Sequence, residues 1–260
     1  MKVLILPDAQ KAADRTAEVI AATVTARPDA TLGLATGGTM EGVYEHLVTL
    51  GPDMSRSTTF NLDEYVGLSP DHPQSYRRFM QTHLFDPLGM PRKRTHLPRG
   101  DAPDPEAEAR RYERAIADAG GIDLQLLGIG RNGHIGFNEP SSSLGSRCRI
   151  KTLTRATRDA NSRFFASLDE VPRHAITMGI ATILDARRVV LLATGSAKAR
   201  AVADMVEGPI SARCPASALQ LHPAADIICD EAAAAELRLR EYYETVHPGG
   251  AEADVTGGCA

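Results

Sequence analysis

A histidine lies at the centre of a glycine-rich stretch, GIGRNGHIGFNEP, which spans residues 128–140 and follows an apolar run. The glycines exclude a regular helix, so His134 is expected on a loop at the end of a strand, where polar groups can face a ligand. With Asn132 and Glu139 nearby, one ring nitrogen can be oriented while the other exchanges a proton. The stretch predicts an acid/base site, and a hydrogen-bonded structural histidine is the alternative.

A metal site is a competing interpretation of the same loop. A lone histidine with one carboxylate supplies too few ligands, and neither HxH nor HExxH spacing occurs. The cysteines are scattered without a CxxC pair, at Cys148, Cys214, Cys229 and Cys259. We therefore expect no metal, no disulfide framework, and reduced thiols in the cytoplasm.

A second candidate is the pair Asp63 and Glu64, at the end of the stretch FNLDEY. Adjacent side chains on a strand point to opposite faces, so one carboxylate alone is expected to enter a shared pocket. A carboxylate at the carboxyl end of a strand is a candidate general base. A helix cap or a surface ion pair is the alternative.

A third candidate is an anion site. Gly37, Gly38 and Thr39 lie in ATGGT, between an expected strand and helix, where backbone N–H groups and the helix N-terminus attract an oxyanion. The stretch matches neither the Walker pattern nor GxGxxG, so no nucleotide is implied. Arg163 and Lys198 lie near the starts of expected helices, where a cation is unfavourable unless an anion shares the site. Together they indicate a phosphate clamp, and a tight turn with two solvated cations is the alternative.

Apolar spacing along the chain alternates between short buried runs and helical periods, which is typical of βα units. We expect strands at 31–36, 60–65, 124–130, 189–194 and 226–230. We expect helices at 10–26, from about 40, at 74–84, 105–119, 171–186, 195–208 and 231–246. Ligands bind outside the carboxyl ends of parallel strands, so the candidate loops should converge there.

The composition fits one α/β domain. A chain of 260 residues with 43% hydrophobic residues can bury a sizeable core. We predict a single-domain, Rossmann-like open sheet, mostly parallel, with helices on both faces, over residues 1–246, followed by a disordered tail at 247–260. The net charge of −4 gives no attraction for nucleic acid or an anionic membrane surface. No apolar run reaches the roughly 18 residues of a membrane span.

The order of several segments resembles that of the glucosamine-6-phosphate deaminase family. These segments are LATGGTMEGVYEHL, FNLDEYVGL followed by HPQSY, GIGRNGHIGFNEP, SRCRIKTLT, ANSRFF, GSAKA and LQLHP. The match runs from about residue 31 to about residue 230, and DEYVGL together with GHIGFNEP is specific. The resemblance implies an enzyme that converts D-glucosamine 6-phosphate and water to D-fructose 6-phosphate and ammonia, without cofactor or metal.

The resemblance also implies a role for each candidate residue. Asp63 matches the base that moves a proton between C2 and C1 of the open-chain sugar. His134 matches the imidazole that opens the pyranose ring, and Glu139 matches the carboxylate that orients it. Asn132 replaces an aspartate of some members; its amide can hold the ring N–H but cannot stabilise an imidazolium by charge. The phosphate positions are matched by Gly37, Gly38, Thr39, Arg163 and Lys198.

A second phosphate site is implied by the same resemblance. Some hexameric members are activated by N-acetylglucosamine 6-phosphate between subunits, and this chain has matching residues in Ser142, Arg149, Lys151 and Thr152. A homo-oligomer, with a hexamer as one form, is the corresponding expectation. An ordinary basic surface strand is the alternative.

Two other functions stay open. A 6-phosphogluconolactonase shares the fold but hydrolyses a lactone, and its members resemble DGHTASLFP where this chain has NGHIGFNEP. Sugar-phosphate-responsive transcription regulators use a related domain for binding alone. They would need an attached helix-turn-helix of about 50 residues, for which we expect no room. A sensor without catalysis is expected to lack Asp63, His134 or Glu139, and all three are present.

Overall fold

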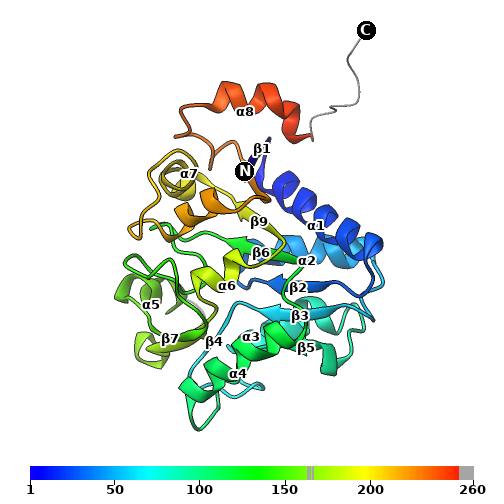
Figure 1. The fold of residues 1–260 in the computed structure, drawn as a ribbon, viewed down its shortest axis with the longest axis vertical. Helices are drawn as coiled ribbons and strands as arrows, with labels where there is room; N and C mark the ends of the chain where they lie inside the picture. The colour runs from blue at the N-terminus through cyan, green and yellow to red at the C-terminus, as the bar shows by residue number, and fades with distance from the viewer. Residues whose placement is uncertain (163–164, 166, 252–260) are drawn as a thin grey trace.

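The computed structural model describes residues 1–162, 165 and 167–251. A seven-stranded parallel sheet crosses the molecule in the order β1-β10-β9-β6-β2-β3-β5 (Figure 1). Its strands are β1 (Lys2–Leu6), β2 (Thr31–Leu34), β3 (Thr58–Asn61), β5 (Thr95–His96), β6 (Leu124–Gly128), β9 (Arg188–Ala193) and β10 (Ala225–Asp230). The Rossmann-like, mostly parallel fold that the sequence predicts is confirmed.

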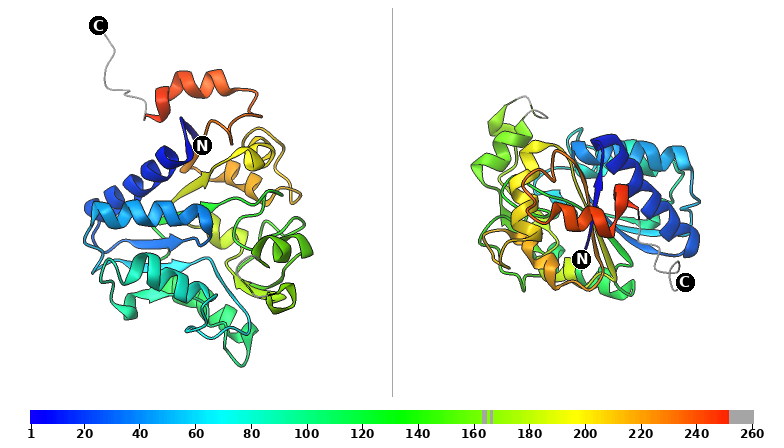
Figure 2. Two further views of the ribbon diagram at one scale, coloured as in Figure 1. Left: turned by 180° about the vertical axis from the view of Figure 1, so that it is seen from behind. Right: turned by 90° about the horizontal axis from the view of Figure 1, so that it is seen from above.

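Helices cover both faces of this sheet. They are α1 (Ala9–Ala26), α2 (Gly38–Leu50), α3 (Tyr76–Met80) with a π-helical turn (Gln81–Phe85), α4 (Pro105–Asp118), α5 (Arg155–Asn161), α6 (Ile180–Leu184), α7 (Ala199–Val206) and α8 (Arg240–Val246). Helices α1 and α2 pack together on the face seen in Figure 2 (left), while α6 lies on the face seen in Figure 1. In the described part of the chain, no helix has the length and hydropathy needed to cross a bilayer.

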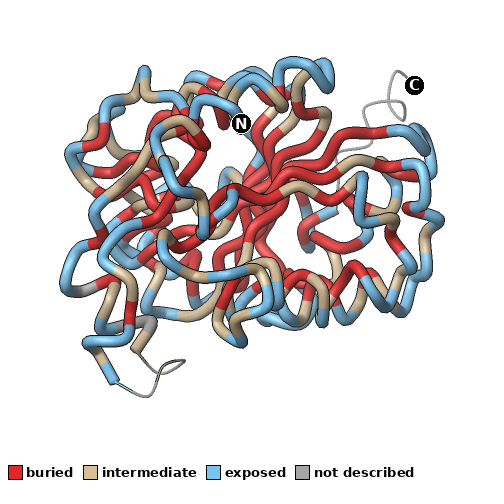
Figure 3. Tube along the Cα trace, turned by 90° about the horizontal axis from the view of Figure 1, so that it is seen from below, coloured by how far each residue is buried: buried red, intermediate tan, exposed pale blue. Residues whose placement is uncertain are grey.

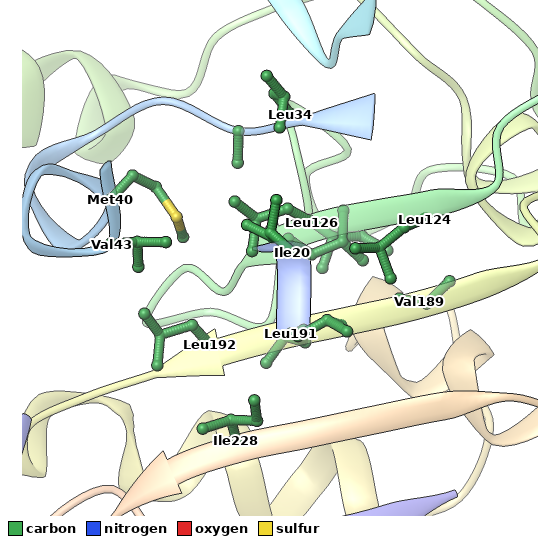
Figure 4. Close-up of a cluster of buried hydrophobic side chains, with 14 of the residues drawn as sticks. Ile20, Leu34, Met40, Val43, Leu124, Leu126, Val189, Leu191, Leu192 and Ile228 are labelled. Atoms are coloured by element: carbon green, nitrogen blue, oxygen red, sulfur yellow. The ribbon is translucent and has the colours of Figure 1, made fainter. Parts of the chain in front are cut away.

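The core is built from the strands themselves. Parallel strands that are covered on both faces read as continuous apolar runs, and β6, β9 and β10 are buried along nearly their whole length (Figure 3). Helix α1 turns the expected face toward them, with Ala13, Ala17, Ile20 and Val24 buried. The side chains that meet between strands and helices include Ile20, Leu34, Met40, Val43, Leu126, Leu191 and Ile228 (Figure 4). This core fixes the carboxyl ends of the central strands.

The single strand expected at 60–65 is wrong, because the chain changes sheets at Leu62. Its N–H donates to Leu34 O of the parallel sheet at 2.9 Å, while its carbonyl accepts from Met178 N at 2.7 Å. The residues that follow form β4 (Asp63–Tyr65) in a second, antiparallel sheet with the order β4-β8-β7, which includes β8 (His174–Thr177) and β7 (Arg149–Thr152). This switch carries Asp63 out of the parallel sheet.

The helix expected at 171–186 is also wrong at its start. Residues 174–177 are strand β8, which pairs with β4 on one side and β7 on the other, and helix α6 begins only at Ile180. A short apolar run satisfies a strand as well as a helix, and here two partner strands decide. Gly179 lies between the two elements. The residue must be glycine, because a Cβ there would lie 2.0 Å from the carbonyl oxygen of Ser146.

The C-terminal region differs from the expectation as well. The helix expected at 231–246 is reduced to α8, and residues 231–236 form turns in which the Asp230 carboxylate accepts from Ala233 N at 2.7 Å. Part of the expected tail, Pro248–Gly250, forms a 3-10 turn that contacts β1. Residues 252–260 of the tail lie outside the described residues.

Candidate active site

The loops with candidate residues meet at the carboxyl ends of neighbouring strands. Strands β9, β6 and β2 are adjacent in the sheet, so the loops after Ala193, Gly128 and Leu34 come together, as expected for an open α/β sheet. A hydrogen bond of 2.6 Å from Lys198 Nζ to Ile129 O joins two of these loops directly.

His134 is held by an amide bridge. Its Nδ1 lies 2.7 Å from Asn132 Oδ1, and Asn132 Nδ2 in turn donates to Glu139 Oε2 at 2.7 Å. Because the amide N–H groups face the carboxylate, the amide oxygen faces the ring, and Nδ1 must carry the proton of this hydrogen bond. The Glu139 carboxylate lies a further step away, 3.5 Å from Nδ1. The ring is partly exposed and its Nε2 is left as the proton acceptor.

Two threonines complete the surroundings of Glu139. Thr157 donates to Glu139 Oε1, and Thr154, the N-cap of α5, contacts the same oxygen at 3.3 Å. Burial alone disfavours the charged carboxylate, but the hydrogen bonds from His134 and Thr157 outweigh it and lower the pKa of Glu139 to about 2. Glu139 is therefore anionic at neutral pH. No sequence signal pointed to Thr157, because a lone threonine in a polar stretch has many ordinary uses.

Glycines permit two close approaches in the histidine loop. A Cβ on Gly130 would lie 2.2 Å from the imidazole, so the ring packs directly on this backbone. Gly136 has φ +53°, and a Cβ there would lie 3.3 Å from Asp63 Oδ2. The loop that carries His134 therefore packs close to Asp63, and the N–H of Phe137 in this loop donates a hydrogen bond to the Asp63 carboxyl group.

Asp63 is buried on β4, where it lies opposite Thr177 of β8. Burial, together with the charge of neighbouring Glu64, raises the pKa of Asp63 to about 8, although hydrogen bonds from the Thr177 side chain and the Phe137 N–H oppose the shift. The Thr177 hydroxyl itself accepts from Phe137 N at 3.2 Å. The sequence offered no signal for Thr177, whose position depends on strand pairing.

The Glu64 carboxylate has different hydrogen-bond partners from that of Asp63. It accepts backbone N–H groups of Tyr65, Tyr76 and Arg77 at 2.9, 3.0 and 2.9 Å, and thereby caps the start of α3. Burial raises the pKa of Glu64 to about 7 against these hydrogen bonds. The two adjacent carboxylates are therefore separated, with Asp63 beside the histidine loop and Glu64 in a structural role.

The anion-site candidates lie on this edge too. Gly37 is the N-cap of α2 with φ +119°, and Gly38 and Thr39 of the first turn are exposed. A cavity of about 260 Å³ opens beside Gly37, with Tyr65 of β4 in its wall. Burial and the charge of Arg131 lower the pKa of Lys198, as expected for a cation without an anion beside it. Arg163 lies outside the described residues.

The residues expected at a second phosphate site lie in different surroundings. Ser142 is buried, and neither its hydroxyl nor Nη2 of Arg149 has a hydrogen-bond partner among the described residues. Arg149 and Lys151 alternate with their neighbours on β7, and Arg149 pairs with Thr177, which in turn pairs with Asp63. Thr152 lines a separate cavity.

The described residues contain no group of three or more His, Cys, Asp or Glu side chains that could hold a metal ion. The residues brought together here form three groups: the His134 imidazole with Glu139 behind it, the buried carboxyl group of Asp63, and the N–H-rich turn at Gly38. Such a set can move protons on a small phosphorylated ligand.

Comparison with known proteins gives the same direction. The chain is 53% identical over 250 residues to the glucosamine-6-phosphate deaminase of Shewanella loihica, with 95% of this chain and 93% of that protein covered. It is 55% identical to the glucosamine-6-phosphate deaminase of Hahella chejuensis, with 95% of each chain covered. A solved structure described as a monomeric glucosamine-6-phosphate deaminase superposes with a TM-score of 0.89 at 47% identity, covering 91% of this chain and 100% of the other.

More distant structures share the fold alone. The 6-phosphogluconolactonase of Trypanosoma brucei superposes with a TM-score of 0.72 at 19% identity, covering 91% of this chain and 98% of the other. Residues 8–228 match the family described as glucosamine-6-phosphate isomerases/6-phosphogluconolactonase. This match covers most of the chain, and the protein belongs to that family.

Proposed function

We propose that this protein is an enzyme that converts D-glucosamine 6-phosphate and water to D-fructose 6-phosphate and ammonia. Relatives with this activity in their names are 53% and 55% identical over nearly the whole chain. The observation that carries the proposal is the hydrogen bond from the Phe137 N–H to Asp63, by which the loop of the His134 relay contacts this carboxyl group. Two proton-transfer groups of different character can therefore act on one bound sugar.

Ring opening is assigned to His134. With Nδ1–H held by Asn132, the neutral Nε2 accepts the proton of the C1 hydroxyl. The C1–O5 bond breaks as the C1 carbonyl forms, and the proton passes to O5. Glu139 stabilises the transient imidazolium, since its carboxylate lies 3.5 Å from Nδ1.

Proton transfer in the open chain is assigned to Asp63. Its carboxylate takes the proton from C2, the C1–C2 double bond forms, and one proton of the substrate ammonium passes to the C1 oxygen, which gives a neutral enolamine. The carboxylic acid then returns its proton to C1, which leaves an iminium at C2. Water adds to the iminium, ammonia leaves, and the C2 carbonyl remains. A base with a raised pKa suits this step, because its conjugate acid must survive long enough to protonate C1.

The phosphate is assigned to the exposed N–H groups of Gly38 and Thr39, with Lys198 and Arg163 as cations. The substrate carries an ammonium at the end opposite its phosphate, and this cation complements the carboxyl groups of Asp63 and Glu139. We also propose that the enzyme works in the cytoplasm, and that residues 1–246 form the catalytic domain.

We extend the proposal to activation by N-acetylglucosamine 6-phosphate at Ser142, Arg149, Lys151 and Thr152, in a homo-oligomer. The unpaired buried atoms of Ser142 and Arg149 support an anion there. Sedimentation equilibrium tests the assembly: a hexamer or other closed oligomer is expected, and a monomer at all concentrations would rule out a site shared between subunits. The monomeric relative makes this measurement decisive.

The activity itself is tested by incubating purified protein with glucosamine 6-phosphate and measuring fructose 6-phosphate and ammonia in the same samples. Equal amounts of the two products are expected. If no turnover occurs with or without N-acetylglucosamine 6-phosphate, and 6-phosphogluconolactone is hydrolysed instead, the proposal is wrong and lactone hydrolysis replaces it.

A further inference from the structure

A second cavity lies away from the candidate active site. It has a volume of about 470 Å³ and opens between the end of β7, helix α5 and the 3-10 turn Leu168–Glu170. Pockets for small molecules have volumes of about 300–1,000 Å³, so this one can hold a ligand of sugar-phosphate size. Its polar lining consists of Thr152, Arg155, Arg158, Asp169 and Arg173.

The lining is unusually cationic for a chain with a net charge of −4. Arg155, Arg158 and Arg173 line the cavity together with one acidic residue, Asp169, and Arg155 also pairs with Asp159 of its own helix. The ion pair of Arg155 with Asp159 is long, at 3.9 Å, and the Arg155 side chain is 87% exposed. An exposed pair of this kind contributes little and is easily exchanged for a better anion.

Arg158 gives the cavity a fixed positive wall. Its guanidinium donates to the carbonyl oxygens of Leu168 and Val171 at 2.7 and 3.2 Å. Carbonyl groups hold the side chain in place without neutralising its charge. A partly buried guanidinium held by two carbonyl groups, beside the exposed Arg155 and Arg173, is suited to phosphate, whose oxygens accept the paired N–H groups of arginine.

Helix α5 connects this cavity to the relay of the candidate active site. Arg155 and Arg158 line the cavity, while Thr154, the N-cap, and Thr157 of the same short segment hold Oε1 of Glu139. The threonine hydroxyls also bond to each other at 3.0 Å. The arginines of the cavity and the threonines that contact Glu139 thus belong to one short segment, through which a bound ligand can act on the Glu139 carboxylate.

We propose that this cavity binds a phosphate group, free or as a monoester, and that its occupancy changes the contact between Thr157 and Glu139. The site shares no lining residue with the catalytic groups, and it shares Thr152 alone with the activator site proposed above. Binding in the cavity does not depend on the catalytic activity. The effect on Glu139 deepens that function by giving it a regulator of defined chemistry.

Calorimetric titration of the full-length protein tests the binding, with inorganic phosphate in one arm and fructose 6-phosphate in the other. In the double variant Arg155→Gln/Arg173→Gln, the binding event assigned to the cavity is expected to become at least about tenfold weaker, since two charge-assisted contacts are lost. Arg110→Gln is the matched control, because Arg110 also forms an exposed i,i+4 ion pair, at 3.8 Å, outside the cavity. Tighter binding of fructose 6-phosphate would identify a monoester as the ligand, and equal binding would identify phosphate alone.

The variant Lys198→Ala distinguishes phosphate binding at the proposed clamp from binding in the cavity. It is expected to weaken binding at the clamp and to leave unchanged the binding that depends on Arg155 and Arg173. Unchanged titrations in the double variant, or equal weakening in the Arg110→Gln control, would overturn the cavity site whatever the outcome at Lys198. Melting curves of all variants verify that they are folded.

The connection to Glu139 is measured in the Lys198→Ala background by following the ring signals of His134 by NMR. Phosphate is expected to change the chemical shifts of this ring when Arg155 and Arg173 are present, and to leave them unchanged in the double variant. Ring signals that respond identically in both proteins would refute the connection.

Discussion

Asp63 and Glu139 are both carboxyl groups that are nearly inaccessible, with exposures of 6% and 3%, yet their environments act in opposite directions. Burial raises the pKa of Asp63 to about 8, while hydrogen bonds overcome burial at Glu139 and lower its pKa to about 2. The difference lies in donors: Glu139 receives Asn132, His134 and threonine hydroxyls, whereas Asp63 has a second carboxylate as its sequence neighbour.

The comparison teaches that burial does not decide protonation by itself. A loop can fold around a carboxylate and bring several donors to it, as the histidine loop and α5 do for Glu139. The Asp63 carboxyl group receives the Thr177 hydroxyl and the Phe137 N–H, and these two donors do not offset its burial. Glu139 is accordingly suited to remain charged and orient a ring, and Asp63 to accept and return a proton.

Replacement of the strand carboxylate should have the largest effect. Asp63→Asn is expected to lower kcat by about 10²–10⁴-fold, because proton transfer at C2 loses its base. Steady-state formation of fructose 6-phosphate measures this. Asp71→Asn, an exposed substitution in the loop after β4, is the control and should match the wild type. Retention of wild-type kcat by Asp63→Asn would remove Asp63 from the mechanism.

Replacement of the loop carboxylate should have a smaller effect. Glu139→Gln is expected to lower kcat/KM by up to about 100-fold, since the ring loses orientation and charge but keeps its own nitrogen. Glu108→Gln is the matched control, because Glu108 is also buried and accepts a backbone N–H, from Arg99 at 2.9 Å, away from the site. A loss at Glu139 as large as that at Asp63 would contradict the division of roles.

The two carboxyl groups should also differ in how they affect stability with pH. A raised folded pKa means that native Asp63 keeps its proton while the unfolded chain has lost it, so this group costs stability as pH rises from about 4 to about 8. The free energy of unfolding of Asp63→Asn, relative to that of the wild type, should therefore be higher at pH 8 than at pH 4 by roughly 1–3 kcal/mol. Glu139, with its lowered pKa, contributes stability that is present above about pH 4.5 and lost toward pH 2.

Urea unfolding of both variants at pH 4, 6 and 8 measures these differences. Glu64 is present in every protein, but its charge raises the pKa of Asp63, so the Asp63→Asn comparison reports the titration of the pair. An Asp63→Asn gain that does not grow with pH would show that the aspartate is ionised in the folded protein.

The smallest effect is expected at Thr177. Its hydroxyl lowers the pKa of Asp63, so Thr177→Val should raise that pKa further and move the acid limb of kcat/KM to higher pH. A loss of several-fold at pH 7, which disappears at high pH, is expected, as a hydrogen bond of this kind contributes about 1 kcal/mol. Thr177→Ser retains the hydroxyl and should keep the wild-type profile. Equal losses at all pH values in Thr177→Val would indicate a packing defect instead.

Residues with a strong local signal were predictable from the sequence. The glycines around His134 exclude a helix, and the apolar run before them ends at a turn, so the loop and its strand follow from local chemistry. The same holds for the Gly37 turn and for the buried face of α1.

Features that depend on distant partners were not predictable in this way. Residues 174–177 become a strand because β4 and β7 flank them, and the second sheet starts at Leu62 because two chain segments bond to it. Thr157 and Thr177 have no distinguishing sequence context, and both gain their roles from where the chain brings a carboxylate.

The pairing of β1 with β10 has a consequence for how the protein is made. Residues 2–6 find their native neighbour in residues 226–230, so the first strand to be synthesised completes the sheet after nearly all the others have left the ribosome. Helix α8 and the 3-10 turn that cover β1 emerge later still. Throughout translation the segment KVLIL is an apolar strand without its partner, which makes it the part of the nascent chain most exposed to chaperones and to mispairing.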